Sequence, residues 1–94
     1  SSCDALPQGN DDYKKYMQIW EEKRELASGY LLKAEKSFKQ GDELAGCSFQ
    51  QKASVLGIDA TESLIRAIEI SGVQKDFKDL ESGLNKWKEL GDFC

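Results

Sequence analysis

From residue 13 onward, hydrophobic side chains recur in steps of three and four, the spacing that lines up one side of an α-helix. A second flank of such residues widens this stripe toward half of the helix circumference, which predicts contact with more than one neighbour. The pattern keeps its phase across Gly29 and predicts one long helix over residues 12–40. The stripe comprises Tyr13, Met17, Trp20, Arg24, Ala27, Leu31, Ala34 and Phe38, and the flank comprises Tyr16, Ile19, Leu26 and Tyr30.

Turn signals divide the rest of the chain. Gly41 suits the left-handed position after a helix, and Asp42 suits the cap of the next helix. A second break is expected at residues 57–59, because Asp59 precedes Glu62 with the spacing of a capping box. The predicted later helices run from the first turn to Leu56, over residues 60–71, and from Val73 to the C-terminus.

The regular spacing is cleanest in the first and last helices, so these two are expected to supply the main core, with most of the aromatic side chains in it. No strand pattern competes. The sequence predicts an all-α fold, a small bundle of three to four helices with a long first helix, in one domain over residues 12–94. Residues 1–11 are expected to form a flexible N-terminal leader or tether, with Asn10, Asp11 or Asp12 capping the first helix.

The composition agrees with amphipathic helices, because 39% of the residues are hydrophobic and 32% are charged. The net charge of −4 is divided equally, with −2 from residues 1–47 and −2 from residues 48–94. Neither half forms a basic patch, so nucleic-acid binding is not expected. No apolar run approaches the roughly 20 residues of a membrane span.

The residues that most often perform catalysis are missing or badly spaced. The chain has no histidine, the commonest general base. A thiol nucleophile at Cys47 would need a lysine or a carboxylate as its base, a weak arrangement. We therefore expect no catalytic residue, no metal site and no cofactor. The paired carboxylates are sequence neighbours that point about 100° apart on a helix: Asp11-Asp12, Glu21-Glu22 and Asp42-Glu43.

The cysteines Cys3, Cys47 and Cys94 are interpreted as crosslinks formed in an oxidising compartment. At ~1.5 Å rise per residue, Cys47 and Cys94 of an up-down bundle lie roughly 36 and 33 Å above the turn near Gly72. These similar heights predict a disulfide between them. It would close a loop of about 48 residues and contribute about 3–4 kcal/mol. Pairing of Cys3 with either cysteine, or three free thiols in a cytosolic protein, are the alternatives.

The N-terminal Ser-Ser-Cys resembles the visible end of a bacterial lipobox, in which small residues precede a lipidated cysteine. The resemblance implies a lipid anchor at Cys3, a signal peptide already removed, and a place in the periplasm or at the outer membrane. The alternative is an ordinary disulfide cysteine near the processed N-terminus of a secreted protein. Export follows in either case.

Residues 34–57 resemble a hairpin of the tetratricopeptide repeats, a family of protein-binding helical repeats with a period of 34 residues. Gly41 and Ala53 occupy turn and packing positions of such a hairpin, and Leu-Gly pairs end two units 34 residues apart. The resemblance implies a tandem-hairpin adaptor. In that arrangement Cys47 and Cys94 would lie more than about 15 Å apart.

A candidate partner surface lies off the main stripe of the first helix, at Tyr16, Ile19 and Leu26, together with Arg24. Arg24 either carries a buried, paired charge or reaches past the edge of the stripe into solvent. The sequence predicts an extracytoplasmic domain that binds another protein without catalysis, as an adaptor, secretion chaperone, pilotin or toxin-immunity protein. The alternatives are a carrier of a small apolar ligand, similar to secretoglobins in size and terminal cysteines, and a cytosolic helical-repeat adaptor.

Overall fold

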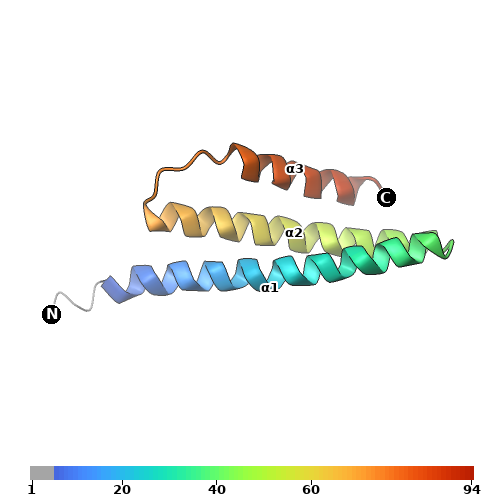
Figure 1. Ribbon diagram of the computed structural model, residues 1–94, viewed down its shortest axis with the longest axis horizontal. Helices are drawn as coiled ribbons and strands as arrows, with labels where there is room; N and C mark the ends of the chain where they lie inside the picture. Colours follow the sequence, from blue (N-terminus) through green and yellow to red (C-terminus); the bar gives the residue numbers. More distant parts are fainter. Residues whose placement is uncertain (1–5) are drawn as a thin grey trace.

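The computed structural model describes residues 6–94, which form three α-helices and no strand: α1 (Leu6–Lys39), α2 (Glu43–Ser71) and α3 (Lys78–Asp92). The helices form an open layer in which α2 lies in the middle and contacts both neighbours, whereas α1 and α3 do not contact each other (Figure 1). The predicted all-α fold with a long first helix is confirmed.

The turn between α1 and α2 is made by the two residues that predict it. Gly41 has a φ of +80°, in the left-handed region that glycine enters without steric cost. The Gly41 N–H donates to the Phe38 carbonyl at 3.0 Å, and the Asp42 N–H donates to the Ser37 carbonyl at 2.9 Å. These two bonds make a Schellman motif. The Asp42 carboxylate then accepts the Ala45 N–H at 3.1 Å and caps α2.

The expected break at residues 57–59 is wrong, because α2 runs through it without interruption. Gly57 is buried inside the helix against the Trp87 ring, and its carbonyl accepts the Thr61 hydroxyl at 2.8 Å. Asp59 does not cap a new helix; its carboxylate accepts a hydrogen bond from Lys23 Nζ at 3.0 Å. The residues that suggest a break locally are used in tertiary contacts, so the chain has three helices.

Two other expected boundaries differ from the structure. α1 begins at Leu6 and includes residues 10–12, which were expected to cap it, so the second half of the predicted leader is helical. Val73, expected to open the last helix, lies 64% exposed in the connection between α2 and α3. α3 begins at Lys78, whose N–H donates to the Asp76 carboxylate at 2.9 Å. The connection is therefore longer than expected and α3 is shorter.

Small side chains that repeat every seven residues line the contact between α1 and α2. Gly46 of α2 continues this repeat toward the turn, and a Cβ atom added at Gly46 would lie only 2.6 Å from the Phe38 ring. Residues seven apart lie on the same side of a helix after two turns, so a small residue at each repeat lets the two backbones approach closely. The main core thus lies between α1 and α2, and the expectation that the first and last helices supply it is wrong. The buried alanines are Ala27 and Ala34 in α1 and Ala53, Ala60 and Ala67 in α2.

The contact between α2 and α3 uses a different side of α2, and two glycines make room for it. A methyl group on Gly57 would overlap the Trp87 indole, and one on Gly91 would lie 2.5 Å from Ser54 Oγ. Ser54 Oγ donates a hydrogen bond to the Trp87 carbonyl at 2.6 Å. A large side chain over a glycine and a hydrogen bond to the backbone of α3 therefore help to hold α3 on α2.

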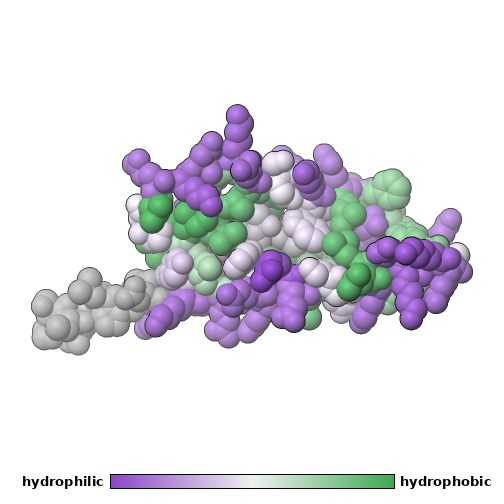
Figure 2. Space-filling view, viewed as in Figure 1, coloured by the Kyte–Doolittle hydropathy of each residue, from purple (hydrophilic) through white to green (hydrophobic). Residues whose placement is uncertain are grey.

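No side chain larger than glutamine is buried between residues 11 and 94, so the expectation that most aromatic side chains are enclosed in the core is wrong. A layer of three helices cannot surround its large side chains, and they remain partly exposed on its faces. Figure 2 shows hydrophobic groups reaching the surface between the helices, with hydrophilic side chains along the outer edges.

Candidate protein-interaction face

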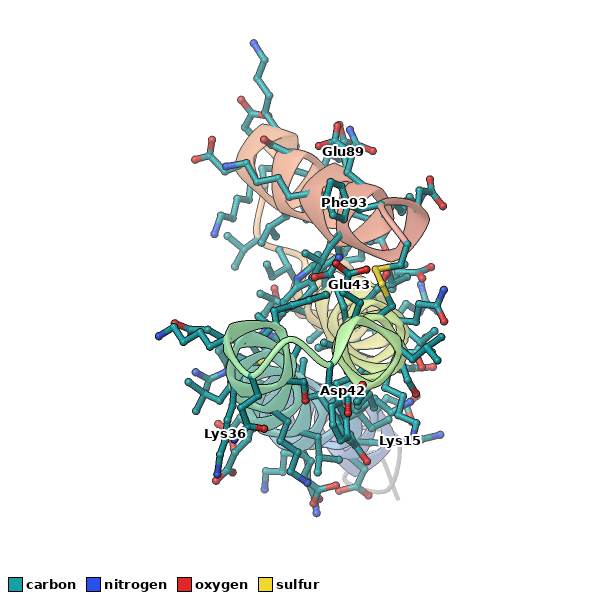
Figure 3. All side chains as sticks on the ribbon, turned by 90° about the vertical axis from the view of Figure 1, so that its right-hand side faces the viewer. Lys15, Lys36, Asp42, Glu43, Glu89 and Phe93 are labelled. Atoms are coloured by element: carbon teal, nitrogen blue, oxygen red, sulfur yellow. A yellow bond between two sulfur atoms is a disulfide. The ribbon has the colours of Figure 1, made fainter. Side chains whose placement is uncertain are left out.

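Cys47 and Cys94 form a disulfide between the start of α2 and the C-terminal residue, the pairing that the sequence predicts (Figure 3). Their Cα atoms lie 5.5 Å apart, which contradicts the separation of more than about 15 Å expected for a tandem-hairpin array. The unbroken α2 is also incompatible with that array. Cys3 lies outside the described residues.

A buried glutamine supports the disulfide. Gln50 is only 8% exposed, and its Nε2 donates to the Leu90 carbonyl at 2.9 Å and lies 3.7 Å from Cys94 Sγ. Leu90 belongs to the last turn of α3, where backbone carbonyls lack partners within the helix. Gln50 and Ser54 were not predicted as site residues, although both lie on the same flank of α2 as Cys47, at steps of three and four residues.

Arg24 does not belong to the same surface as the other predicted partner residues. Its side chain is exposed, and the guanidinium lies 4.6 Å from the centre of the Trp20 ring, a cation–π contact. This agrees with the interpretation that it reaches past the hydrophobic stripe into solvent. Residues two apart point about 200° apart on a helix, so Arg24 and Leu26 lie on opposite flanks of α1.

The other three predicted residues line shallow hollows along one side of the α1–α2 contact. Tyr16 and Ile19 share a hollow with Asp59 and Glu62 of α2. Leu26 and Tyr30 line a second hollow, and Tyr30 also lines a third with Val55 and Leu56. We call this surface the α1–α2 face and define it by Tyr16, Ile19, Leu26, Gly29, Tyr30, Phe49, Val55 and Leu56.

An aromatic pair lies at the centre of the α1–α2 face. The Tyr30 and Phe49 rings are stacked with their centres 6.0 Å apart and their planes inclined by 26°. Lys33 and Lys52 lie 5.2 to 5.9 Å from the ring centres. The periodicity of α1 identifies Tyr30 as a flank residue, but nothing in the sequence predicts that the Phe49 ring stacks on it, because that contact depends on how the two helices are aligned.

The side chains beside this pair are apolar and open to solvent. Leu26 is 54% exposed and Val55 is 60% exposed. The hollows around them are depressions of the surface and not enclosed cavities. Within residues 6–94, no cluster of three or more histidine, cysteine or acidic side chains is arranged to hold a metal ion. None of the three helices combines the length and the apolar character needed to cross a membrane.

Comparison with known proteins finds no matching family model, no similar curated protein and no similar solved structure. The function is therefore inferred from the site itself and not from a relative.

Proposed function

We propose that this chain is an extracytoplasmic protein-binding domain that acts by contact, without catalysis, through the α1–α2 face. The observation that carries this proposal is that no large apolar side chain between residues 11 and 94 is fully buried, and that Leu26, Val55 and the Tyr30–Phe49 pair gather on one face. Contiguous exposed apolar surface is typical of a binding site.

The α1–α2 face has the properties of a preorganised surface. The alanines beneath it hold the two helices closely together, so the face changes shape little when a partner binds. Aromatic side chains at the centre of an interface often supply most of its binding energy, and the Tyr30–Phe49 pair occupies that position. The exposed Leu26 and Val55 side chains add apolar area on either side.

The disulfide supports a place outside the cytoplasm, because such bonds form and persist in oxidising compartments. We place the domain in a bacterial periplasm or at the outer membrane, with Cys3 as a lipid tether in the second case, and otherwise among secreted proteins. A small, acidic domain stapled by a disulfide suits an adaptor, a secretion chaperone or pilotin, or an immunity protein that blocks a toxin.

A carrier of a small apolar ligand is the second candidate. Ligand sites of this kind bury most of the ligand in a concave pocket. The open hollows along the α1–α2 contact favour a protein partner over such a ligand, because a flat partner surface can cover them without enclosing anything.

Affinity purification from the native host tests the proposed function. We expect the tagged wild-type chain to retain a protein partner and the Leu26→Glu variant to lose it, because a carboxylate buried beside the central aromatic pair is unfavourable. Leu32→Glu is the matched control, since Leu32 is also exposed, at 67%, but lies about 200° around α1 from Tyr30. Recovery of the same proteins with all three chains would contradict the proposal.

A further inference from the structure

The α1–α2 face carries positive charge on the side toward the turn. Lys33 and Lys52 flank the Tyr30–Phe49 pair, within 6 Å of the ring centres. Neither lysine has an ion-pair partner among the described residues. Both charges are therefore available to a partner.

Negative charge lies on the same face toward the other end. Glu22 and Glu25 line the hollow around Gly29, and Glu62 lines the next hollow along. Nearby cations are already engaged, because Lys23 pairs with Asp59 at 3.0 Å and Arg66 lies 3.9 Å from Glu69. Lys15 lies two helical turns beyond Glu22 and is outside this acidic group.

The basic and acidic groups on the α1–α2 face lie at equal distances on either side of one line that runs across the layer, perpendicular to the helices. The midpoint between Glu22 and Lys33 falls between Ala27 and Ser28 of α1. The midpoint between Lys52 and Glu62 falls at Gly57 of α2. Counted from the helix ends at the turn, Lys39 and Glu43, these two points lie at the same height within about 4 Å. A second copy turned by 180° about this line would set each basic group against an acidic one.

Gly29 lies beside this line, and no other side chain between residues 11 and 94 packs on it. A glycine within a helix costs about 1 kcal/mol relative to alanine. The Gly46, Gly57 and Gly91 positions are explained by the side chains packed on them, but a side chain at Gly29, like one at Gly83 of α3, would meet nothing within 4 Å. Gly29 instead leaves a hollow in the surface. The same two-fold operation that exchanges Glu22 and Lys33 places Leu26 of one copy opposite Gly29 of the other.

We propose that a second copy of this chain covers the α1–α2 face in a two-fold symmetric dimer, with the two α1 helices antiparallel. This inference rests on the proposed function, because it names the protein that occupies the same face. Lys33 faces Glu22 of the other copy, Lys52 faces its Glu62, and Leu26 enters its hollow at Gly29. An isologous contact of this kind uses the same patch on both subunits, so each of these interactions occurs twice.

Sedimentation velocity of the disulfide-bonded chain from about 1 to 100 μM tests the dimer. We expect a monomer–dimer equilibrium that shifts toward monomer in about 0.5 M salt, since the ion pairs are screened. Leu26→Glu and Gly29→Leu should each weaken dimerisation by at least about tenfold, and the control Leu32→Glu should leave it unchanged. A wild-type chain that stays monomeric at every concentration overturns the inference.

Charge reversal tests the symmetry separately. The variant carrying Lys33→Glu and Lys52→Glu, and the variant carrying Glu22→Lys and Glu62→Lys, should each be monomeric, because like charges then face each other. Mixed in equal amounts, they should form a one-to-one heterodimer. Failure of the mixture to associate, with both variants helical by circular dichroism, contradicts the arrangement.

The two proposals fail in different ways. If the wild type is monomeric but Leu26→Glu still loses a partner purified from the native host, the dimer is wrong and the binding function stands. If the wild type dimerises as expected but no variant affects capture of any other protein, the dimer stands and the proposed partner at this face is wrong.

Discussion

At the scale of single residues, five glycines inside the helices between residues 11 and 94 fall into two groups, according to whether another side chain packs on them. Gly46, Gly57 and Gly91 each lie under a side chain of another element, so their missing Cβ is a packing requirement. Gly29 and Gly83 lie in the same kind of helical backbone with open space around them. Helix propensity alone treats all five as equally unfavourable. Their surroundings therefore decide what a substitution does.

Gly57→Ala and Gly29→Ala make a matched pair of substitutions. Gly29→Ala should raise the free energy of unfolding by about 0.5–1 kcal/mol, because alanine is the better helix former and the space is open. The free energy of unfolding of Gly57→Ala should be lower than that of Gly29→Ala by at least about 1.5 kcal/mol, because the Trp87 ring must move. Urea denaturation followed by circular dichroism at low micromolar concentration measures both. Equal effects would mean that Trp87 does not pack on Gly57.

At the scale of elements, α3 depends on α2 alone. It has no contact with α1, it is joined to α2 by an exposed connection, and its side chains are only partly buried. Trp87, the polar contacts of Gln50 and Ser54, and the disulfide at Cys94 hold it in place. The alanine seam between α1 and α2 includes no residue of α3.

Removing the disulfide should therefore loosen α3 selectively. In the Cys47→Ser, Cys94→Ser variant, we expect the backbone amides of α3 to lose most of their protection from hydrogen exchange, while those along the α1–α2 seam lose much less. The bond closes a loop with a sequence separation of 47 and is expected to contribute about 3–4 kcal/mol. Hydrogen-exchange mass spectrometry measures each helix separately. A uniform loss of protection in all three helices would contradict this division.

The features that could be predicted from the sequence are those that do not depend on how side chains from distant segments pack. The turn at Gly41-Asp42, the end of α2 at Gly72 and the Cys47–Cys94 pair depend on local geometry and helix length, and these predictions agree with the structure. The break at residues 57–59 does not occur, because Trp87 from a distant segment covers Gly57. Periodicity shows which side of a helix is apolar, but not which neighbour covers it.

The candidate site was predictable only in part for the same reason. Tyr16, Ile19 and Leu26 share a helical flank, so their grouping follows from spacing along α1. Arg24 was included from its position in the stripe, but its side chain lies on the other flank over Trp20. Phe49, Val55 and Leu56 join the face from α2, and their place beside Tyr30 depends on the alignment of two helices that only the fold determines.

At the scale of the whole molecule, residues 11–94 bury alanines and leave their larger apolar side chains partly exposed. Compact domains usually enclose several leucine, isoleucine or phenylalanine side chains. Here an open layer of three helices places them on its faces, and the α1–α2 face gathers two stacked rings, two lysines and two exposed aliphatic side chains. The central claim is that protein covers this face in the cell.

Site-specific photo-crosslinking in the native host tests this claim most directly. A photoreactive phenylalanine analogue replaces Leu26 on the α1–α2 face in one chain and Leu32, on the other flank of α1, in a second. We expect a strong protein adduct from position 26 and little from position 32, and an adduct of twice the chain's mass would identify the second copy. An adduct from position 32 without one from position 26 would contradict the account.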